Sequence, residues 1–170
     1  MQKNAMQNVT EAGEAEKIDV AMNIFAKPYQ TALSILSLLR QSGKHVGNLW
    51  LQFEPYGSQY DIVSPYAVAQ YLSGQLGERC RVFQPDYWLD LKAADPERFH
   101  EASYRYGIRY QYAFEHSASR KLFLMHNDVL VLQDVLGFLL GQMDNAVAVG
   151  HLGQCWNCPA HVEELTREVM

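Results

Sequence analysis

Residues 120–131 read RKLFLMHNDVLV, and this stretch decides how we interpret the fold. A short apolar run, Leu122 to Met125, ends abruptly in the polar residues His126, Asn127 and Asp128. The pattern predicts a buried β-strand that delivers a carboxylate at its carboxyl end, which is where open α/β sheets bind their ligands. A strand followed by a plain polar turn explains the same residues without any function.

Strand and helix patterns alternate on either side of this stretch. Strands are predicted at residues 18–25, 46–53, 80–83, 121–125 and 146–149. Helices are predicted at residues 28–42, from Pro65 to Gly74 or Gly77, at 96–116, and over a short stretch that starts near Asp134. Gly43 should end the first of these helices as a left-handed cap. Such alternation predicts an α/β fold, in which helices cover both faces of a mostly parallel sheet. Three polar segments should then meet at the carboxyl edge of the sheet, namely residues 23–27, 54–61 and 126–128.

The composition is that of a folded protein. Of the 170 residues, 48% are hydrophobic and 19% are charged, as in globular chains. The net charge of -5 argues against a nucleic-acid partner, because phosphate neutralisation needs clustered Lys and Arg. We find no apolar run long enough for a transmembrane helix and no apolar core of a signal peptide. With an odd number of cysteines, three, we expect a cytoplasmic protein, and peripheral association with the inner face of the membrane is compatible with this.

We expect the chain to have three parts. Residues 1–17 are rich in Gln, Asn, Glu and Ala and are predicted to be a flexible tail. Residues 18–150 carry the strand–helix alternation and should form one α/β domain. Residues 151–170 form a C-terminal segment that contains cysteine and histidine.

Three stretches of the sequence occur in an order that is typical of one protein family. The first runs from residues 20–25 (VAMNIF) through 33–42 (LSILSLLRQS), the second is 104–108 (YRYGI), and the third is 122–129 (LFLMHNDV), within the segment quoted above. Together they resemble the opening strand and helix, the segment before the metal-binding strand, and the metal-binding turn of a GT-A glycosyltransferase of the family 2-like group. The likeness covers residues 18–150 and corresponds to the nucleotide-sugar-binding half of that family.

The resemblance implies a GT-A (nucleotide-diphospho-sugar transferase) type of fold and transfer of a sugar to a glycan or lipid-linked acceptor. It also implies a Mg²⁺ or Mn²⁺ ion, which would bridge the two phosphates of the donor as a Lewis acid. Asp128 stands at the family's metal-binding position, and His126 stands where the family has a first acidic residue. The residues that the resemblance places at the nucleotide sugar are Asn23, Phe25, Glu54, Arg105 and Asn127.

These site residues also have explanations without function. Asn23 can be a turn residue, Phe25 a packing residue, and Arg105 an exposed or salt-bridged side chain. The loop at 54–61 departs from the family's acidic loop, and no residue matches the family's catalytic base. In the family, that base and the acceptor site follow the metal turn, so we expect residues 151–170 to continue into an acceptor half.

A cysteine–histidine cluster lies near the C-terminus. His151, Cys155, Cys158 and His161 have the residue types of a tetrahedral Zn²⁺ site. A redox-active or disulfide-bonded Cys-x-x-Cys and a pair of thiols without function are the alternatives. Besides a glycosyltransferase, the sequence therefore allows a truncated nucleotide-binding domain without catalysis and a zinc-containing interaction domain.

Overall fold

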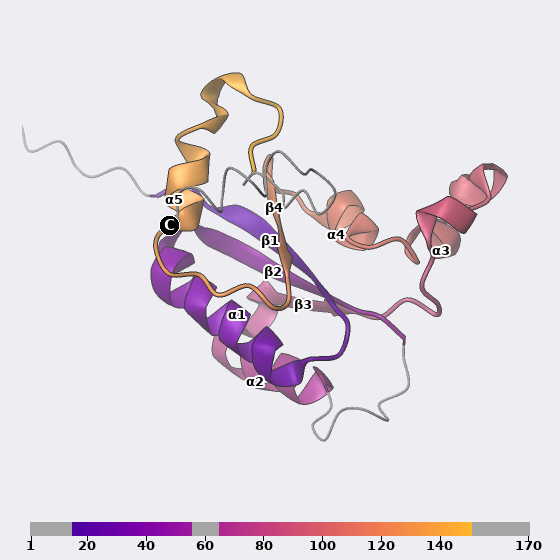
Figure 1. Ribbon diagram of the computed structural model, residues 1–170, viewed down its shortest axis with the longest axis horizontal. Coiled ribbons are helices and arrows are strands. Elements are labelled where there is room, and N and C mark those ends of the chain that lie inside the picture. Colours follow the sequence, from indigo (N-terminus) through magenta and orange to yellow (C-terminus); the bar gives the residue numbers. More distant parts are fainter. Residues whose placement is uncertain (1–14, 56–64, 151–170) are drawn as a thin grey trace, which may run out of the picture. The chain divides into compact units, whose positions relative to one another are not determined.

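Four strands form one parallel sheet in the computed structural model, which describes residues 15–55 and 65–150. The strands are β1 (Ile18–Ile24), β2 (Val46–Phe53), β3 (Cys80–Phe83) and β4 (Leu122–His126). Their order across the sheet is β3-β2-β1-β4, and every neighbouring pair is parallel (Figure 1). The predicted α/β fold with a parallel sheet is confirmed.

The chain divides into two compact units, Met1–Gly137 and Phe138–Met170. The sheet belongs to the first unit. Helix α5 (Val135–Leu140) begins beside Asp134, as predicted, and its last three residues belong to the second unit. The described part of that unit continues with a 3₁₀ turn, Met143–Asn145.

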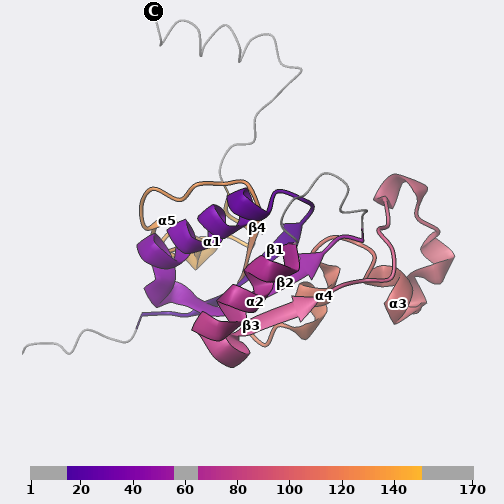
Figure 2. The same cartoon turned by 90° about the horizontal axis from the view of Figure 1, so that it is seen from below.

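Helices α1 (Pro28–Ser42) and α2 (Pro65–Leu76) cover one face of the sheet (Figure 2). Pro28 occupies the first turn of α1, where a missing N–H removes no helical hydrogen bond. Ile35 and Leu38 of α1 are completely buried, and so is Met22 at the centre of the sheet. All seven residues of β1 are buried because this strand has neighbours on both sides and cover on both faces.

The other face of the sheet carries helix α4 (Gln111–His116), which confirms helices on both faces. The ring of Tyr112 meets that of Trp50 on β2 edge to face, with their centroids 6.1 Å apart. Edge-to-face contact is a favoured geometry for aromatic rings, and it adds to the apolar area that they bury.

A buried carboxylate joins the strands under α4. Asp19 of β1 is 3% exposed and accepts four hydrogen bonds. Asn48 donates through its backbone and its side chain, Trp50 donates through Nε1, and Ser117 donates through Oγ. Burial alone would raise the pKa of Asp19, but these hydrogen bonds outweigh it and lower the pKa below its ordinary value.

Three predictions about local structure are wrong. The single helix expected at 96–116 is a 3₁₀ turn (Pro96–His100), a short helix α3 (Ala102–Arg105) and α4. The helix is interrupted at Gly107, whose carbonyl accepts a hydrogen bond from the Leu89 N–H at 2.8 Å, and at Tyr110, which has a left-handed backbone with φ of 66°.

The strand expected at 146–149 is irregular, and Val147 is fully exposed there. Gly43 does not end α1 as a left-handed cap, since its φ is -59° and the chain continues into a 3₁₀ turn. Of the helices in the described ranges, none is both long and apolar enough to cross a membrane.

Candidate functional site

A small polar cavity lies at the carboxyl ends of β1 and β4. Its volume is about 150 Å³. Five residues that the resemblance places at the donor or the metal line this cavity: Asn23, Phe25, His126, Asn127 and Asp128. Three lining residues were not among the predicted site residues: Lys27, Arg109 and Tyr110.

The loop between β1 and α1 has an unusual backbone. Ala26 and Lys27 both adopt left-handed conformations, with φ of 51° and 58°. Each such residue costs about 1–3 kcal/mol unless it is glycine. The buried amide of Asn127 supports the loop, because its Nδ2 donates to the Ala26 carbonyl at 3.2 Å and to Thr31 Oγ1 at 2.9 Å.

This loop brings Lys27 against the turn after β4. Lys27 Nζ donates to Asp128 Oδ2 at 2.6 Å, and the two side chains are 49% and 41% exposed. The hydrogen bond from Lys27 lowers the pKa of Asp128 below its ordinary value. The carboxylate at the predicted metal position is therefore ionised and already has a cationic partner.

A second ion pair, between Glu54 and Arg109, lies beside the cavity. Glu54 follows β2, is 5% exposed, and accepts hydrogen bonds from Asn23 Nδ2 and from Arg109 Nε, both at 2.5 Å. The Arg109 guanidinium also lies 5.4 Å from the centre of the Trp88 ring, within the range of a cation–π contact. Glu54 thus holds Arg109 at the cavity through a buried carboxylate.

Asn23 leaves one buried atom without a partner. The residue is 7% exposed, and within residues 15–55 and 65–150 its Oδ1 accepts no hydrogen bond. An unsatisfied buried acceptor costs about 1–3 kcal/mol. Turning the amide over would place Oδ1 against the Glu54 carboxylate, so the observed orientation is the favourable one. A ligand that donates an N–H or O–H here would remove the cost.

Tyr110 completes the wall of the cavity. Its left-handed backbone ends the preceding turn and begins α4, and its hydroxyl lies 3.5 Å from the Met125 carbonyl. Burial raises the pKa of the Tyr110 hydroxyl. The sequence patterns placed residues 109 and 110 inside a continuous helix, which is why they were not predicted.

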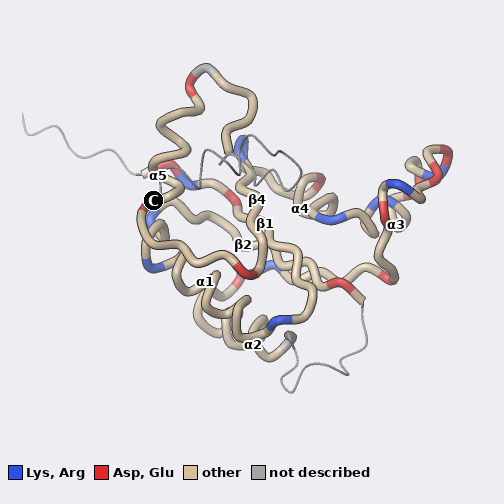
Figure 3. Tube along the Cα trace, in the orientation of Figure 1, with Lys and Arg blue, Asp and Glu red and all other residues tan. Residues whose placement is uncertain are grey.

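Arg105, which the resemblance places at the pyrophosphate, does not line the cavity. Its Nε and Nη2 pair with the Glu115 carboxylate at 2.8 and 3.0 Å, in a region where acidic and basic residues lie side by side (Figure 3). Its Nη1 donates to the Phe99 carbonyl. The sequence left a salt-bridged role open for this residue, and the observed contacts are of that kind.

The donor atoms around Asp128 fit a hard divalent cation poorly. Mg²⁺ and Mn²⁺ prefer several oxygen ligands. Here one carboxylate, already bound to Lys27, stands beside the imidazole of His126. Across the described ranges there is no group of three or more His, Cys, Asp and Glu side chains that could hold a metal ion. The predicted zinc ligands, His151, Cys155, Cys158 and His161, lie outside those ranges.

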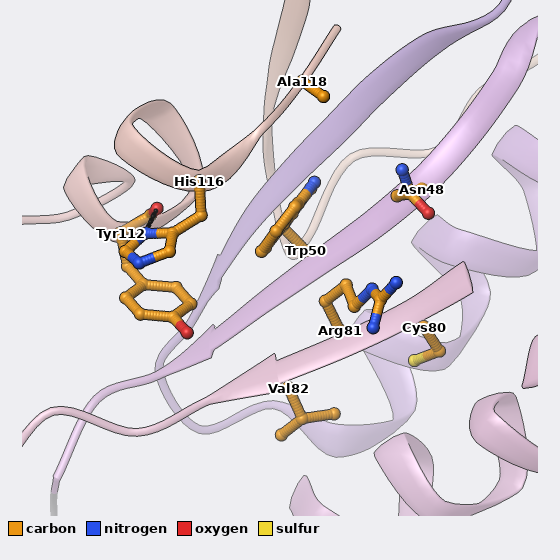
Figure 4. A pocket seen from close by; sticks show the side chains of 8 residues that line it. All are labelled: Asn48, Trp50, Cys80, Arg81, Val82, Tyr112, His116 and Ala118. Carbon is orange, nitrogen blue, oxygen red and sulfur yellow. Dashed lines mark hydrogen bonds between the residues drawn. The ribbon is translucent and has the colours of Figure 1, made fainter. Parts of the chain in front are cut away.

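A larger hollow of about 560 Å³ lies on the α4 face of the sheet, over β2 and β3 (Figure 4). Its walls include Trp50, Arg81, Tyr112 and His116, and the rings of Tyr112 and His116 stack with centroids 4.1 Å apart. None of the predicted site residues lines it. We favour the smaller cavity as the functional site, because two ion pairs and an unsatisfied acceptor meet there at the carboxyl edge of a parallel sheet.

The chain matches no protein-family model, and no curated protein is significantly similar to it. The functional interpretation therefore depends on the geometry of the cavity and on the sequence resemblance.

Proposed function

We propose that the cavity binds the diphosphate of a nucleotide-diphosphate sugar, and that the protein is a glycosyltransferase acting on a glycan or lipid-linked acceptor. One observation carries this proposal. Two cations, Lys27 and Arg109, line a cavity at the carboxyl edge of the sheet, beside a buried acceptor that has no partner among the described residues. The two cations favour an anionic ligand, and the unsatisfied acceptor favours a ligand that also has N–H or O–H groups.

The position of α1 adds to the attraction for an anion. Helix α1 has 15 residues, begins directly after Lys27, and has no side-chain hydrogen bond at its N-cap. The N-terminus of a helix carries a partial positive charge and free N–H groups, which favour phosphate. The GT-A resemblance supports the same assignment, because it places the nucleotide sugar at Asn23, Phe25 and Asn127.

A second candidate function is binding without transfer. Inverting transfer requires a general base that accepts the proton of the acceptor hydroxyl. Of the acidic side chains beside the cavity, Glu54 is bound to Arg109 and Asn23, and Asp128 is bound to Lys27. Because both carboxylates already have partners, a module that binds the nucleotide sugar for another chain is the competing proposal.

Calorimetric titration of the full chain with UDP, GDP and dTDP tests the binding site. We expect one nucleotide to bind the wild type and to bind Arg109→Gln at least ten-fold more weakly, the loss expected for a charge-assisted hydrogen bond. Gln is chosen because its amide can still donate to Glu54. The matched control is Arg81→Gln, which removes a guanidinium from the larger hollow.

The outcomes separate the two cavities and the two functions. Loss of binding in Arg81→Gln, with Arg109→Gln unaffected, would move the ligand to the larger hollow and refute the proposed site. Once a nucleotide is found, release of that nucleotide from its sugar conjugate in the presence of glycan acceptors distinguishes a transferase from a binding module.

A further inference from the structure

We propose that Lys27 and Arg109 neutralise the diphosphate in place of a divalent metal ion. This inference rests on the proposed function and deepens it, because it assigns the charge that stabilises the bound diphosphate. It departs from what the GT-A resemblance implies, which is a metal ion held at Asp128.

The first argument is the place that the lysine occupies. Lys27 Nζ lies 2.6 Å from Asp128 Oδ2, so its ammonium stands against the carboxylate that a metal ion would use. Two left-handed residues, Ala26 and Lys27, turn the chain into this position, and the buried amide of Asn127 holds the turn. The backbone of the loop therefore positions Lys27 for its contact with Asp128.

The second argument is the number of N–H donors on Lys27 and Arg109 that their carboxylate partners do not use. An ammonium has three N–H donors and a guanidinium has five. Asp128 uses one donor of Lys27, and Glu54 uses only Nε of Arg109. No hydrogen bond to the two Nη atoms of Arg109 is found in the described parts of the chain. Both cations therefore have N–H groups left that can donate to phosphate oxygens.

The third argument is the balance of charge. In the absence of ligand, the two cations are matched by Asp128 and Glu54, which leaves the site close to neutral. The Lys27–Asp128 pair is roughly half exposed, and pairs of this kind contribute little in water. A diphosphate can thus take over Lys27 at small cost, and Asp128 competes with the ligand for this lysine.

The two interpretations predict opposite results for Asp128→Asn. If Asp128 held a metal, this substitution would weaken nucleotide binding. If Asp128 competes for Lys27, the substitution should tighten binding by about two- to five-fold, the range that corresponds to an exposed ion pair. Lys27→Met should weaken binding about ten-fold or more.

The experiment is titration of the full chain with the nucleotide diphosphate that binds best, in excess EDTA and again with Mn²⁺. The matched control is Lys44→Met, which removes a lysine from another Lys–Asp pair, with Asp134, at the far end of α1. Circular dichroism confirms that each variant is folded, and Lys27→Gln replaces Lys27→Met if that variant is not.

We expect binding in EDTA, tighter binding by Asp128→Asn, weaker binding by Lys27→Met, and no change in Lys44→Met. Binding only with Mn²⁺, lost in Asp128→Asn, would overturn this inference and leave the proposed function intact. Absence of binding for all three nucleotides in both conditions would refute the proposed function, and the inference would fall with it.

Discussion

Replacing Asp19 by Asn should destabilise the protein although the two side chains have nearly the same shape. The carboxylate accepts two hydrogen bonds at each oxygen, from Asn48 at Oδ1 and from Trp50 and Ser117 at Oδ2. An amide must turn its NH₂ group toward one of these pairs of donors. The Ser117 hydroxyl can rotate and accept instead, whereas the Trp50 Nε1–H cannot.

The expected loss follows from this geometry. One buried donor without an acceptor costs about 1–3 kcal/mol, and the remaining hydrogen bonds lose their charge assistance. We expect Asp19→Asn to lower the free energy of unfolding by about 2–4 kcal/mol at pH 7. Urea denaturation followed by circular dichroism measures this difference. In a Trp50→Phe background, which lacks the indole N–H, the same substitution should cost less.

The difference should also depend on pH. The pKa of Asp19 is lower in the folded protein than in the unfolded chain, where it is about 3.9. The stability contributed by ionised Asp19 is therefore complete above that value, and it is lost as the pH falls from about 4 through the lowered pKa. The wild type should approach Asp19→Asn in stability over this acidic range. Equal stability of the two proteins at pH 7 would refute the reasoning.

Three other substitutions test separate parts of the structure, each by urea denaturation. A Cβ at Gly47 would lie 2.9 Å from Asp19 Oδ1, so Gly47→Ala should cost about 1–3 kcal/mol, whereas Gly74→Ala, in an open part of α2, should be neutral or stabilising. On α1, Leu38→Ala should cost about 2–5 kcal/mol because Leu38 is completely buried, and Leu33→Ala, at a position that is 56% exposed, should change little. Asn127→Ala should cost about 1–3 kcal/mol and should also weaken nucleotide binding, because it removes the support of the loop that carries Lys27. If Asn127→Ala is destabilised but keeps full nucleotide affinity, its role in supporting the loop is contradicted. If Gly47→Ala and Gly74→Ala, or Leu38→Ala and Leu33→Ala, lose equal stability, the packing argument is contradicted.

The sequence was sufficient to predict the sheet because its signals are local and repeated. The apolar runs that became β1, β2, β3 and β4 were all identified, and Pro28 marked the start of α1. The segment at 96–116 was mispredicted because its helical pattern is interrupted by tertiary contacts. Gly107 makes room for Leu89, and no periodicity in the sequence reports this distant partner.

The site was predicted only in part for a similar reason. Residues near the end of a strand, such as Asn23 in β1 and Asp128 just after β4, could be placed at the carboxyl edge because parallel strands end together. Lys27 was placed at this edge only as the end of the polar segment 23–27. Its contact with Asp128 was not predicted, since it depends on two consecutive left-handed residues that are not glycine. Arg109 was hidden by the helix prediction, and its partner Glu54 is 55 residues away in the sequence.

The cavity is costly for the folded protein, and this cost supports a function there. Left-handed backbone at Ala26 and Lys27 and the unsatisfied Oδ1 of Asn23 each cost about 1–3 kcal/mol. The buried strand β1, which has neighbours on both sides, provides the stability that tolerates them. A ligand that donates a hydrogen bond to Asn23 Oδ1 would remove the cost of the unsatisfied acceptor. If it also accepts a hydrogen bond from Lys27, it binds to the loop whose left-handed backbone causes the other two costs. Part of its binding free energy would then come from satisfying groups that the folded chain leaves unsatisfied.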